Sequence, residues 1–384
     1  MKPAIVVVAY NRPASLRRLL DSLAGLHGVA NVQLVISIDA GGDQFDQVQA
    51  VAARFDWAFG PKQVMVRERP YGLINHVFAC GDLVEQFGSI ILLEDDLVLS
   101  PMAYRYAADA LDFYADDPQI AGISLNALWF HGITHEPFSP YLDDGDVFFM
   151  QIAWFQGQAY TRQQWARFRE WWAGAETAVS PADPMHELFQ SFPPTDWFPQ
   201  KTKYLVQTNR FYVFPRESLS TNFGDSGTHV QGTSFFQVPL QGRRASFRFQ
   251  PLDESVAVYD SFQEMLPERV NQLTNQFAGR DFTVDLYGTR SLANIPTEFV
   301  LTTQEMKNPL ATFGMARRPL LDNVIYQQPG GGIFFGKTAD LDPSWRARLR
   351  SASRRHAYFA RRQVGLRQWL NWWLGRLLDY WANG

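Results

Sequence analysis

The order of apolar and polar residues over the first 120 positions predicts strands that alternate with helices. The continuous apolar run AIVVVAY at residues 4–10 is rich in β-branched residues, as a strand buried on both faces requires. It is followed by NRPASLRRLLDSLAGL, whose leucines recur at helical spacing with Pro13 near the expected start of the helix. Further strands are predicted at VQLVISIDAGG, QVMVRE and SIILLEDD, and further helices at QFDQVQAVAARF and NHVFACGDLVEQF. This alternation predicts an α/β fold, a mainly parallel sheet with helices on both faces.

The pattern changes after residue 120. Residues 129–260 are rich in Trp, Phe, Pro and Gly, with short strand-like pieces between long loops. Loops of this length in a compact enzyme usually form the substrate side. Residues 260–342 carry few regular signals, and an amphipathic pattern follows them. We therefore expect four regions, with boundaries after residues 125, 260 and 342.

Composition limits the class of protein. A chain of 384 residues exceeds what one hydrophobic core usually supports, and 46% apolar with 19% charged residues is typical of a globular protein. The single cysteine, Cys80, excludes an internal disulfide and favours a reducing compartment. The N-terminal residues lack the features of a signal peptide, and no apolar run reaches the length of a membrane-spanning helix. We expect a soluble or peripheral cytoplasmic protein.

Polar residues follow three of the predicted strands at the point where each strand ends. They are Tyr10, Asn11 and Arg12 after the first strand, Asp39 after the second, and Glu94, Asp95 and Asp96 after the fourth. Ligands of parallel sheets bind at the carboxyl ends of the strands, so these positions predict one site.

The three consecutive acids need an explanation, because burial of carboxylates beside an apolar strand is costly without a compensating group. Closely spaced carboxylates are hard oxygen ligands that suit Mg²⁺ or Mn²⁺, with water and the phosphates of a ligand completing the shell. The alternative is that the acids cap the following helix or form salt bridges, which accounts for one acid better than for three.

Three segments taken together resemble the nucleotide-sugar half of GT-A glycosyltransferases: PAIVVVAYNRPASLRRLLDSL, VISIDAGG and ILLEDDLVLSP. Over residues 3–240 the chain resembles N-acetylglucosaminyltransferase I and its bacterial family-2-like relatives, with the acidic triplet in place of the DXD motif. The resemblance implies a Rossmann-like GT-A fold. Residues 1–125 would then be the nucleotide-sugar-binding half, residues 126–260 the acceptor and catalytic half, and residues 261–342 a C-terminal extension.

The resemblance also implies roles in donor binding. Asp96 would hold the divalent cation, Asp95 would face ribose or sugar hydroxyls, and Glu94 would face the donor sugar. Asp39 would accept a hydrogen bond from a uracil ring. Arg12 would lie near the nucleotide phosphates, where a planar guanidinium suits anionic oxygens, or it is simply an exposed residue at a helix start.

One donor position departs from the family. Asn75 stands where the eukaryotic enzyme has a histidine that touches the donor, which leaves the identity of the donor open.

Catalytic residues are implied in the second half. PPTDWFPQ resembles the Asp-Trp segment of the family, so Asp196 matches the catalytic base, which takes the proton of an acceptor hydroxyl in an inverting transfer. His229, in GDSGTHV, is a candidate metal or phosphate contact, although a loop histidine is commonly without such a role. QIAWFQGQAYTRQQWARF resembles the segment beneath the donor sugar, where Trp154 and Gln156 are candidates, although tryptophan is more often a core residue.

Two further segments imitate sites. GGIFFGKT at residues 331–338 satisfies the P-loop pattern, but bulky Phe334 and Phe335 and the poor helix start after it favour a chance match. HEPFSPYLDDGD, with His135, Asp143, Asp144 and Asp146, has spacing that favours a solvated turn or an acceptor-side rim over a metal site.

The C-terminal residues 343–384 form a basic amphipathic region. From residue 345 onward there are nine arginines and one acid, Asp379, while the rest of the chain carries a net charge of −12. An apolar stripe at helical spacing contains several tryptophans: Leu366, Leu370, Trp373, Leu377 and Trp381. Such a helix is typical of binding to an anionic membrane surface, and docking on the acidic body or on a second copy is the alternative. No recognised module supports nucleic-acid binding.

These observations predict an inverting, metal-dependent glycosyltransferase of bacterial glycan or glycolipid biosynthesis. It would move a sugar from a nucleotide sugar, a UDP-sugar on the resemblance, to a hydroxyl acceptor, with Mn²⁺ or Mg²⁺ as cofactor. It would be cytoplasmic and peripheral at the inner face of the cell membrane. The alternatives are a membrane-peripheral binding or scaffold protein on an inactive fold, or a sugar-phosphate nucleotidyltransferase. The last would carry a glycine-rich loop where this chain reads AYNRPAS.

Overall fold

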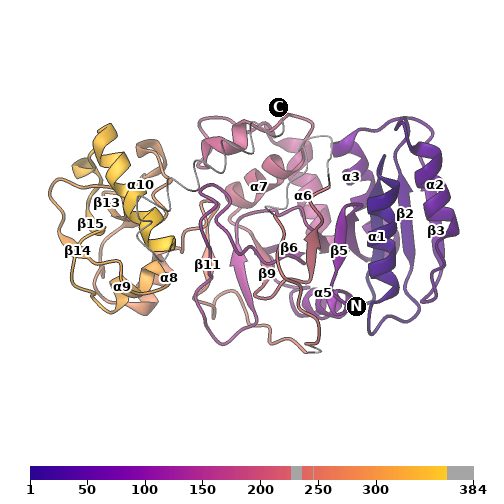
Figure 1. The fold of residues 1–384 in the computed structure, drawn as a ribbon, viewed down its shortest axis with the longest axis horizontal. Helices are drawn as coiled ribbons and strands as arrows, with labels where there is room; N and C mark the ends of the chain where they lie inside the picture. Colours follow the sequence, from indigo (N-terminus) through magenta and orange to yellow (C-terminus); the bar gives the residue numbers. More distant parts are fainter. Residues whose placement is uncertain (226–235, 245, 361–384) are drawn as a thin grey trace, which may run out of the picture. The chain divides into compact units, whose positions relative to one another are not determined.

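The computed structural model describes residues 1–225, 236–244 and 246–360. These residues form two compact units, each with its own sheet (Figure 1). The first unit contains Met1–Trp129 and Pro140–Met265, and the second contains Phe130–Ser139 together with the chain from Leu266 onward.

A nine-stranded sheet forms the centre of the first unit, in the order β11-β7-β9-β6-β8-β4-β1-β2-β3. Its strands are β1 (Ala4–Ala9), β2 (Leu34–Ile38), β3 (Lys62–Val66), β4 (Ser89–Glu94), β6 (Ile120–Ser124), β7 (Val147–Met150), β8 (Gln158–Thr161), β9 (Phe211–Pro215) and β11 (Val258–Tyr259). Strands β3, β2, β1 and β4 are all parallel, whereas β8 runs antiparallel to both β4 and β6. A short antiparallel pair, β5 (Leu97–Leu99) and β10 (Ser220–Asn222), lies outside this sheet. The predicted α/β fold with a mainly parallel sheet is confirmed.

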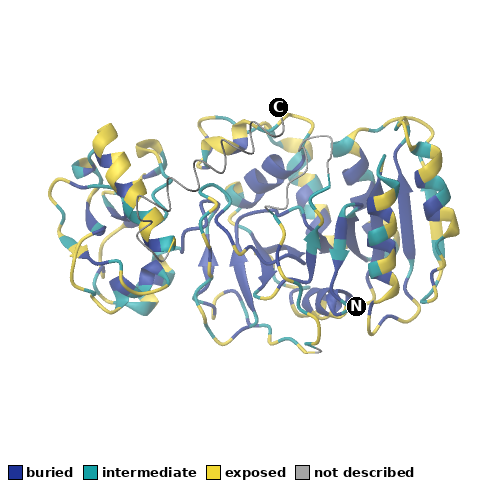
Figure 2. Cartoon of the chain, in the orientation of Figure 1, coloured by how far each residue is buried: buried dark blue, intermediate teal, exposed yellow. Residues whose placement is uncertain are grey.

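The helices of the first unit connect these strands. They are α1 (Pro13–Ala24), α2 (Phe45–Arg54), α3 (Leu73–Gly81), α4 (Val84–Phe87), α5 (Ala103–Phe113), α6 (Arg162–Gly174), the 3₁₀ turn η1 (Glu187–Gln190) and α7 (Phe198–Gln207). The chain runs from β1 to β3 in one direction across the sheet and returns to β4. Right-handed crossovers therefore place α1 and α2 on one face and α3 on the other. The central strands are buried and the outer sides of α1 and α2 are exposed, as their sequence periodicity requires (Figure 2).

The second unit has a four-stranded sheet in the order β12-β13-β15-β14. Its elements are α8 (Pro267–Leu273), β12 (Phe282–Asp285), η2 (Leu292–Asn294), β13 (Phe299–Thr302), β14 (Ala311–Phe313), α9 (Leu320–Ile325), β15 (Ile333–Lys337), η3 (Thr338–Asp340) and α10 (Trp345–Phe359). The P-loop pattern falls on β15, where Gly336 pairs with Val300 and Phe335 is buried. The segment is a strand of a sheet, so the match to the phosphate-binding pattern is accidental.

Helix α10 forms the described part of the basic C-terminal region. Its buried residues are Ala347, Ser351 and Tyr358. Glu305 Oε1 lies 3.5 Å from Arg350 Nε and 2.5 Å from Arg354 Nη2. This half of the region therefore packs against its own unit, while the tryptophan stripe from Leu366 to Trp381 lies outside the described residues. Among the helices that the structure describes, none is long and apolar enough to cross a membrane.

Candidate functional site

The carboxyl ends of β1, β2 and β4 meet at one edge of the large sheet. Val8 is in register with Glu94, and Ala9 with Ile38, so the residues that follow these strands lie on neighbouring chains. The parallel pairing thus brings together the segment after β1, Asp39 and the acidic triplet, as the sequence pattern predicts. The polar strand ends therefore lie together at one edge of the sheet.

A guanidinium group compensates the acids of the triplet. Arg12 Nη2 lies 2.5 Å from Asp95 Oδ1, and Arg12 Nη1 lies 3.0 Å from Asp96 Oδ2. The Asp95 side chain is 4% exposed and that of Asp96 is 24% exposed, so of these two acids Asp96 is the one that solvent or a ligand reaches. Burial opposes ionisation of Arg12, but the neighbouring carboxylates outweigh it and raise its pKa. The salt-bridge alternative from the sequence therefore holds for two of the three acids in this structure.

Two acids of the triplet have raised pKa values despite Arg12. Burial and then the charge of Asp96 raise the pKa of Glu94 to about 8. Burial likewise raises the pKa of Asp95 to about 6, although Arg12 and the backbone N–H of Tyr10 act in the opposite sense. A group that delivers positive charge to this edge would lower both pKa values and stabilise the ionised acids.

Asp196 belongs to the same electrostatic neighbourhood. Its charge is among the causes that raise the pKa of Glu94, although the two residues are 102 positions apart in the sequence. Asp196 Oδ1 accepts a hydrogen bond of 2.9 Å from the backbone N–H of Phe198, the first residue of α7. The start of a helix therefore orients this carboxylate, and negative charge is favoured at that position.

Asp39 is buried and holds the start of α3. Its Oδ1 accepts hydrogen bonds from the N–H groups of Ala40 (3.0 Å) and Tyr71 (2.8 Å), and its Oδ2 accepts one from Gly72 (2.9 Å). Gly72 adopts a φ of 74°, which turns its N–H toward the carboxylate at little cost for a glycine. Since a carboxylate has about four acceptor positions, one position on Oδ2 is left for a further donor such as the predicted uracil.

Asn75 lies in the first turn of α3 and is exposed at the same edge of the sheet. Its Nδ2 donates to the carbonyl oxygen of Tyr71 at 3.0 Å. The predicted donor contact of Asn75 stays a prediction.

A buried polar network beneath this edge escaped the sequence reasoning. His76 Nε2 lies 2.8 Å from Ser37 Oγ, and Arg67 Nε donates to the same hydroxyl at 3.1 Å. Burial and the charge of Arg67 lower the pKa of His76 to about 4, against the charge of Asp39, so the imidazole is neutral at physiological pH. The signal was present in the sequence, because Ser37 is the one polar residue within an apolar strand.

Trp154 and Gln156 lie in the segment between β7 and β8 of the first unit. Trp154 is buried, stacks on Phe155 with 4.5 Å between ring centroids, and makes an edge contact with Phe198. Gln156 Oε1 accepts a hydrogen bond of 2.8 Å from Asn126 Nδ2, which also donates to the carbonyl oxygen of Ser220 at 2.9 Å. Asn126 was missed, although it follows the apolar strand IAGISL in the same way as the other site residues follow theirs.

The predicted metal ligands separate into two cases. Asp96 lies at the acidic edge, and its Oδ2 already accepts a hydrogen bond from the Arg12 guanidinium. Its side chain is partly exposed, so a hard carboxylate ligand is accessible there. His229 lies outside the described residues. Within those residues the structure shows no group of three or more His, Cys, Asp or Glu side chains arranged for a metal ion. The accessible donors suit a cation whose remaining ligands come from water and a bound phosphate.

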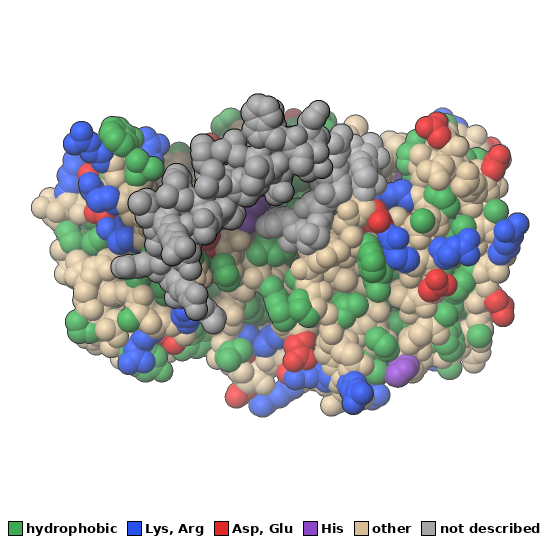
Figure 3. Space-filling model, in the orientation of Figure 1, with side chains coloured by type: hydrophobic (Ala, Val, Ile, Leu, Met, Phe, Trp, Pro, Cys, Tyr) green, Lys and Arg blue, Asp and Glu red, His purple; other side chains and the backbone are tan. Residues whose placement is uncertain are grey.

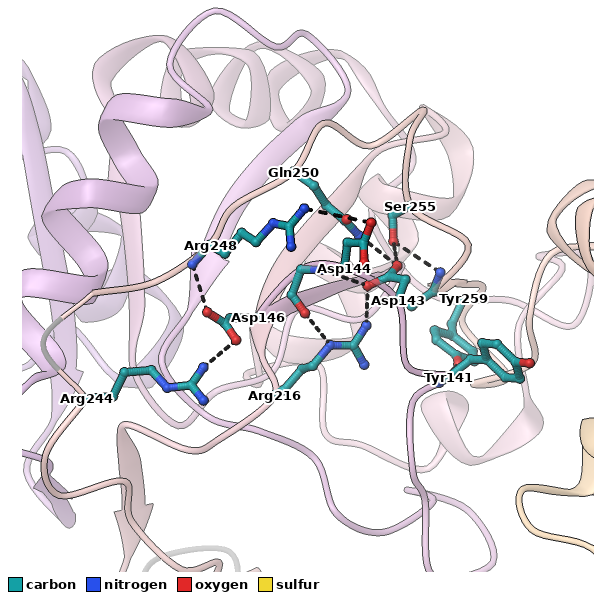
Figure 4. Close-up of polar contacts among 12 residues, drawn as sticks. Tyr141, Asp143, Asp144, Asp146, Arg216, Arg244, Arg248, Gln250, Ser255 and Tyr259 are labelled. Carbon is teal, nitrogen blue, oxygen red and sulfur yellow. Dashed lines mark hydrogen bonds and ion pairs between the residues drawn. The ribbon is translucent and has the colours of Figure 1, made fainter.

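The acids of HEPFSPYLDDGD take part in ion pairs. Asp143 Oδ1 lies 2.6 Å from Arg216 Nη2, and its Oδ2 accepts hydrogen bonds from Gln250 Nε2 (2.7 Å) and Ser255 Oγ (2.6 Å), as Figure 4 shows. Asp146 pairs with Arg244 and accepts the backbone N–H of Arg248. Burial alone would raise the pKa of Asp143, but Ser255 and Arg216 hold it below its usual value. These acids fix the segment around residues 244–255 to the sheet, and His135 lies in the other unit.

Comparisons with known proteins show similarity of structure alone. No family model matches the chain, and no curated protein sequence matches it. The solved structure of S. aureus TarS is similar over 57% of this chain and 36% of that chain, with 15% identity and a TM-score of 0.36. TarS 1–349 in complex with UDP is similar over 57% of this chain and 60% of that chain, with 15% identity and a TM-score of 0.37. The mannosyltransferase PcManGT from Pyrobaculum calidifontis, in complex with GDP-Man and Mn²⁺, is similar over 44% of this chain and 47% of that chain, with 12% identity and a TM-score of 0.31. The similar region thus spans less than two thirds of each of these glycosyltransferases.

Proposed function

We propose that this chain is a glycosyltransferase that moves a sugar from a nucleotide sugar, in the first place a UDP-sugar, to a hydroxyl group of a glycan or glycolipid. The observation that carries the proposal is the placement of the acidic triplet, Arg12 and Asp196 at one edge of the sheet. Groups with raised pKa values at the end of a parallel sheet are typical of a functional site.

The transfer that we propose is an inverting displacement. The acceptor oxygen forms a bond to the anomeric carbon while the bond from that carbon to the diphosphate oxygen breaks, and the electron pair leaves with the nucleoside diphosphate. Attack from the side opposite the leaving group inverts the anomeric centre. Asp196, whose carboxylate is oriented by the start of α7, takes the proton of the acceptor hydroxyl.

Negative charge on the departing diphosphate needs a counter-charge at this edge. Asp96 would hold Mn²⁺ or Mg²⁺, which when bound supplies positive charge beside the diphosphate. Arg12 supplies a permanent positive charge on a planar guanidinium, a donor group that suits carboxylate and phosphate oxygens. We expect Arg12 to move its Nη1 contact from Asp96 to a donor phosphate when the nucleotide sugar binds, while its contact with Asp95 remains.

Donor binding tests the proposal directly. UDP-GlcNAc and GDP-Man, the donors seen in similar structures, provide the probes for titration calorimetry with Mn²⁺ present. Asp96→Ala should weaken binding of the accepted donor by about a hundredfold or more, at the upper end of what metal-site changes cost. The protein should stay folded because Arg12 keeps Asp95 as a partner. Asp144→Ala, which removes an exposed acid, is the matched control and should bind as the wild type does. Equal affinities in all three proteins would contradict the role of Asp96.

Hydrolysis of the bound donor separates chemistry from binding. Water can replace the acceptor, so release of the nucleoside diphosphate reports the transfer step. Asp196→Asn should retain donor affinity while the rate falls about a hundredfold or more, the range expected when a general base is lost. A variant that hydrolyses the donor at the wild-type rate would place the base elsewhere. Wild-type protein that binds donors but neither hydrolyses nor transfers them would favour an inactive scaffold.

We also propose that the basic C-terminal region attaches the enzyme to anionic lipid at the inner face of the cell membrane. Helix α10 exposes Trp345 (63%) and Leu349 (60%) one turn apart. Figure 3 shows Lys and Arg side chains gathered over this part of the second unit. Apolar side chains among cations are the features that favour an anionic membrane surface.

The attachment is tested without deleting α10, because that helix packs on its own unit. Trp345→Ser with Leu349→Ser should reduce sedimentation with vesicles that contain anionic lipid, and removal of residues 361–384 should reduce it further. Leu292→Ser with Leu310→Ser, two residues each 56% exposed in the same unit, is the control and should not change it. Undiminished sedimentation of both tail variants would refute the membrane proposal.

A further inference from the structure

A pocket between α6 and α7 contains none of the residues proposed to act in the transfer. It has a volume of about 320 Å³. The residues that line it come from the second half of α6, the end of α7 and the chain just before β9: Arg167, Glu170, Trp171, Gly174, Ala175, Tyr204, Thr208 and Arg210. Two arginines and two aromatic residues therefore share one concave surface.

Neither arginine is neutralised. Arg167 and Arg210 form no ion pair with any residue that the structure describes, and Nη1 of Arg167 is buried without a hydrogen-bond partner there. Arg210 Nε donates to the carbonyl oxygen of Pro118 at 3.0 Å, which fixes its side chain and leaves the end of the guanidinium for a ligand. Glu170 is exposed and forms no ion pair within the same residues. Unpaired guanidinium groups in a pocket favour an oxyanion such as phosphate or carboxylate.

The aromatic residues form a second recognition element. The rings of Trp171 and Tyr204 lie 5.5 Å apart between centroids with 51° between their planes. Trp171 Nε1 donates to Gln207 Oε1 at 3.2 Å, so this ring is held in place while the residue stays partly exposed. Tyr204 is 1% exposed, and its hydroxyl is buried without a hydrogen-bond partner in the described part of the chain. Aromatic surface with a few convergent polar groups is the usual lining of a ligand site.

The pocket is remote from the acidic edge. Strands β6 and β9 run in the same direction as β4, because β8 is antiparallel to both β4 and β6. Arg210 and Pro118 precede β9 and β6, so they lie at the edge opposite Asp96. Along α7 the distance from Asp196 to Tyr204 is about 12 Å at 1.5 Å per residue. A donor sugar at the acidic edge does not reach the pocket, whereas an extended chain does.

We propose that the α6–α7 pocket binds an anionic sugar unit, bearing phosphate or carboxylate, of an extended glycan. The arginines take the oxyanion, and Trp171 and Tyr204 contact the ring. Identification of that glycan as the acceptor rests on the proposed function, but binding at the pocket does not. The pocket would then hold a distant part of an acidic acceptor and favour polymeric over short acceptors.

Binding of small probes tests the pocket independently of catalysis. Glucose 6-phosphate and glucuronate should bind the wild-type protein, and glucose should bind at least about tenfold more weakly because it lacks the oxyanion. Arg167→Gln with Arg210→Gln should weaken binding of both anionic sugars by about tenfold or more for each charge lost. Tyr204→Phe, a change that removes one oxygen atom, should weaken it by a smaller factor and should not disturb folding. Arg54→Gln with Arg348→Gln removes two exposed arginines elsewhere and should have no effect.

Three outcomes would overturn the inference. Inorganic phosphate that binds as tightly as glucose 6-phosphate would show an adventitious ion site only. Anionic sugars that bind the double-arginine variant as tightly as the wild type would place their site elsewhere. Displacement of glucose 6-phosphate by a saturating nucleotide sugar would show that it occupies the donor site. If Asp96→Ala loses donor binding but still binds glucose 6-phosphate, the donor site and the α6–α7 pocket are separate sites. Failure of the proposed function can then be told apart from failure of the proposed pocket.

Discussion

Replacement of Lys201 by methionine should change the pH dependence of stability in a way that the structure specifies. Lys201 is 2% exposed, and its Nζ donates to Tyr160 Oη at 2.6 Å. The rings of Tyr160 and Trp165 have their centroids 3.9 Å and 4.3 Å from Nζ. No carboxylate pairs with this amine among the described residues, and burial lowers its pKa well below the usual value.

The sign and size of the effect follow from proton linkage. An unfolded chain keeps the lysine protonated up to about pH 10.4, whereas the folded protein releases the proton at a lower pH. The free energy of unfolding therefore rises with pH between the two pKa values, by about 1.4 kcal/mol per pH unit for one proton. Within that interval, each pH unit therefore changes the contribution of Lys201 to the free energy of unfolding by about 1.4 kcal/mol. Methionine has similar length and does not titrate, so the difference between wild type and Lys201→Met isolates this proton.

Urea unfolding of both proteins at a series of pH values measures the difference. As the pH rises toward the pKa of the unfolded lysine, we expect the wild type to gain about 1.4 kcal/mol per pH unit relative to Lys201→Met. Lys2→Met removes an exposed lysine and should give a difference that does not change with pH. A flat difference for Lys201→Met would refute the reasoning, because it would mean that the amine stays charged within the aromatic rings as a cation–π partner. Donor affinity should be unchanged in either case.

Three other changes test the packing around the site, each by urea unfolding. Asp143→Asn should cost about 3 kcal/mol at neutral pH because it leaves the guanidinium of Arg216 without its counter-charge. Since the folded pKa of Asp143 is lowered, this loss should be full above about pH 4 and should vanish as the pH falls through the folded pKa; a loss that persists in acid would contradict the ion pair. Gly81→Ala should cost about 2 kcal/mol, since its Cβ would lie 2.0 Å from Cζ2 of Trp165, and full stability would show that the ring moves freely. Gly72→Ala should lower the free energy of unfolding by about 1 to 2 kcal/mol, because alanine is strained at the positive φ of this position, and it should weaken donor binding. Unchanged donor affinity would show that this turn has no role in donor binding.

Local periodicity predicted the four parallel strands β1 to β4 with little error, but not the other five strands of the first sheet. Buried parallel strands need continuous β-branched runs, and amphipathic helices need leucines every three or four residues. Both patterns can therefore be recognised within a short stretch of sequence. The helix expected at NHVFACGDLVEQF is divided into α3 and α4 at Asp82 and Leu83, a detail that depends on packing against α6. Parallel pairing then places the strand ends together by geometry alone, which is why the acidic triplet and Asp39 were recognisable as one site.

Local sequence patterns did not predict the contacts between segments that are far apart in the sequence. The segment Phe130–Ser139 belongs to the second unit although the chain on both sides of it belongs to the first. Its sequence resembles that of its neighbours, so no change of composition marks the boundary. The ion pairs of Asp143 and Asp146 depend likewise on arginines more than 70 positions away, and so their structural role had no local signature.

The sequence by itself determined which chemistry collects at the edge of the sheet, because strand ends and acidic residues are local features. Only the tertiary structure decided how that chemistry is compensated. It gave Asp95 and Asp96 the guanidinium of Arg12, bound the carboxylate of Asp39 to the start of α3, and brought the charge of Asp196 close to Glu94. Charge interactions depend on distance in space and on exclusion of water, and neither quantity is set until the chain has packed.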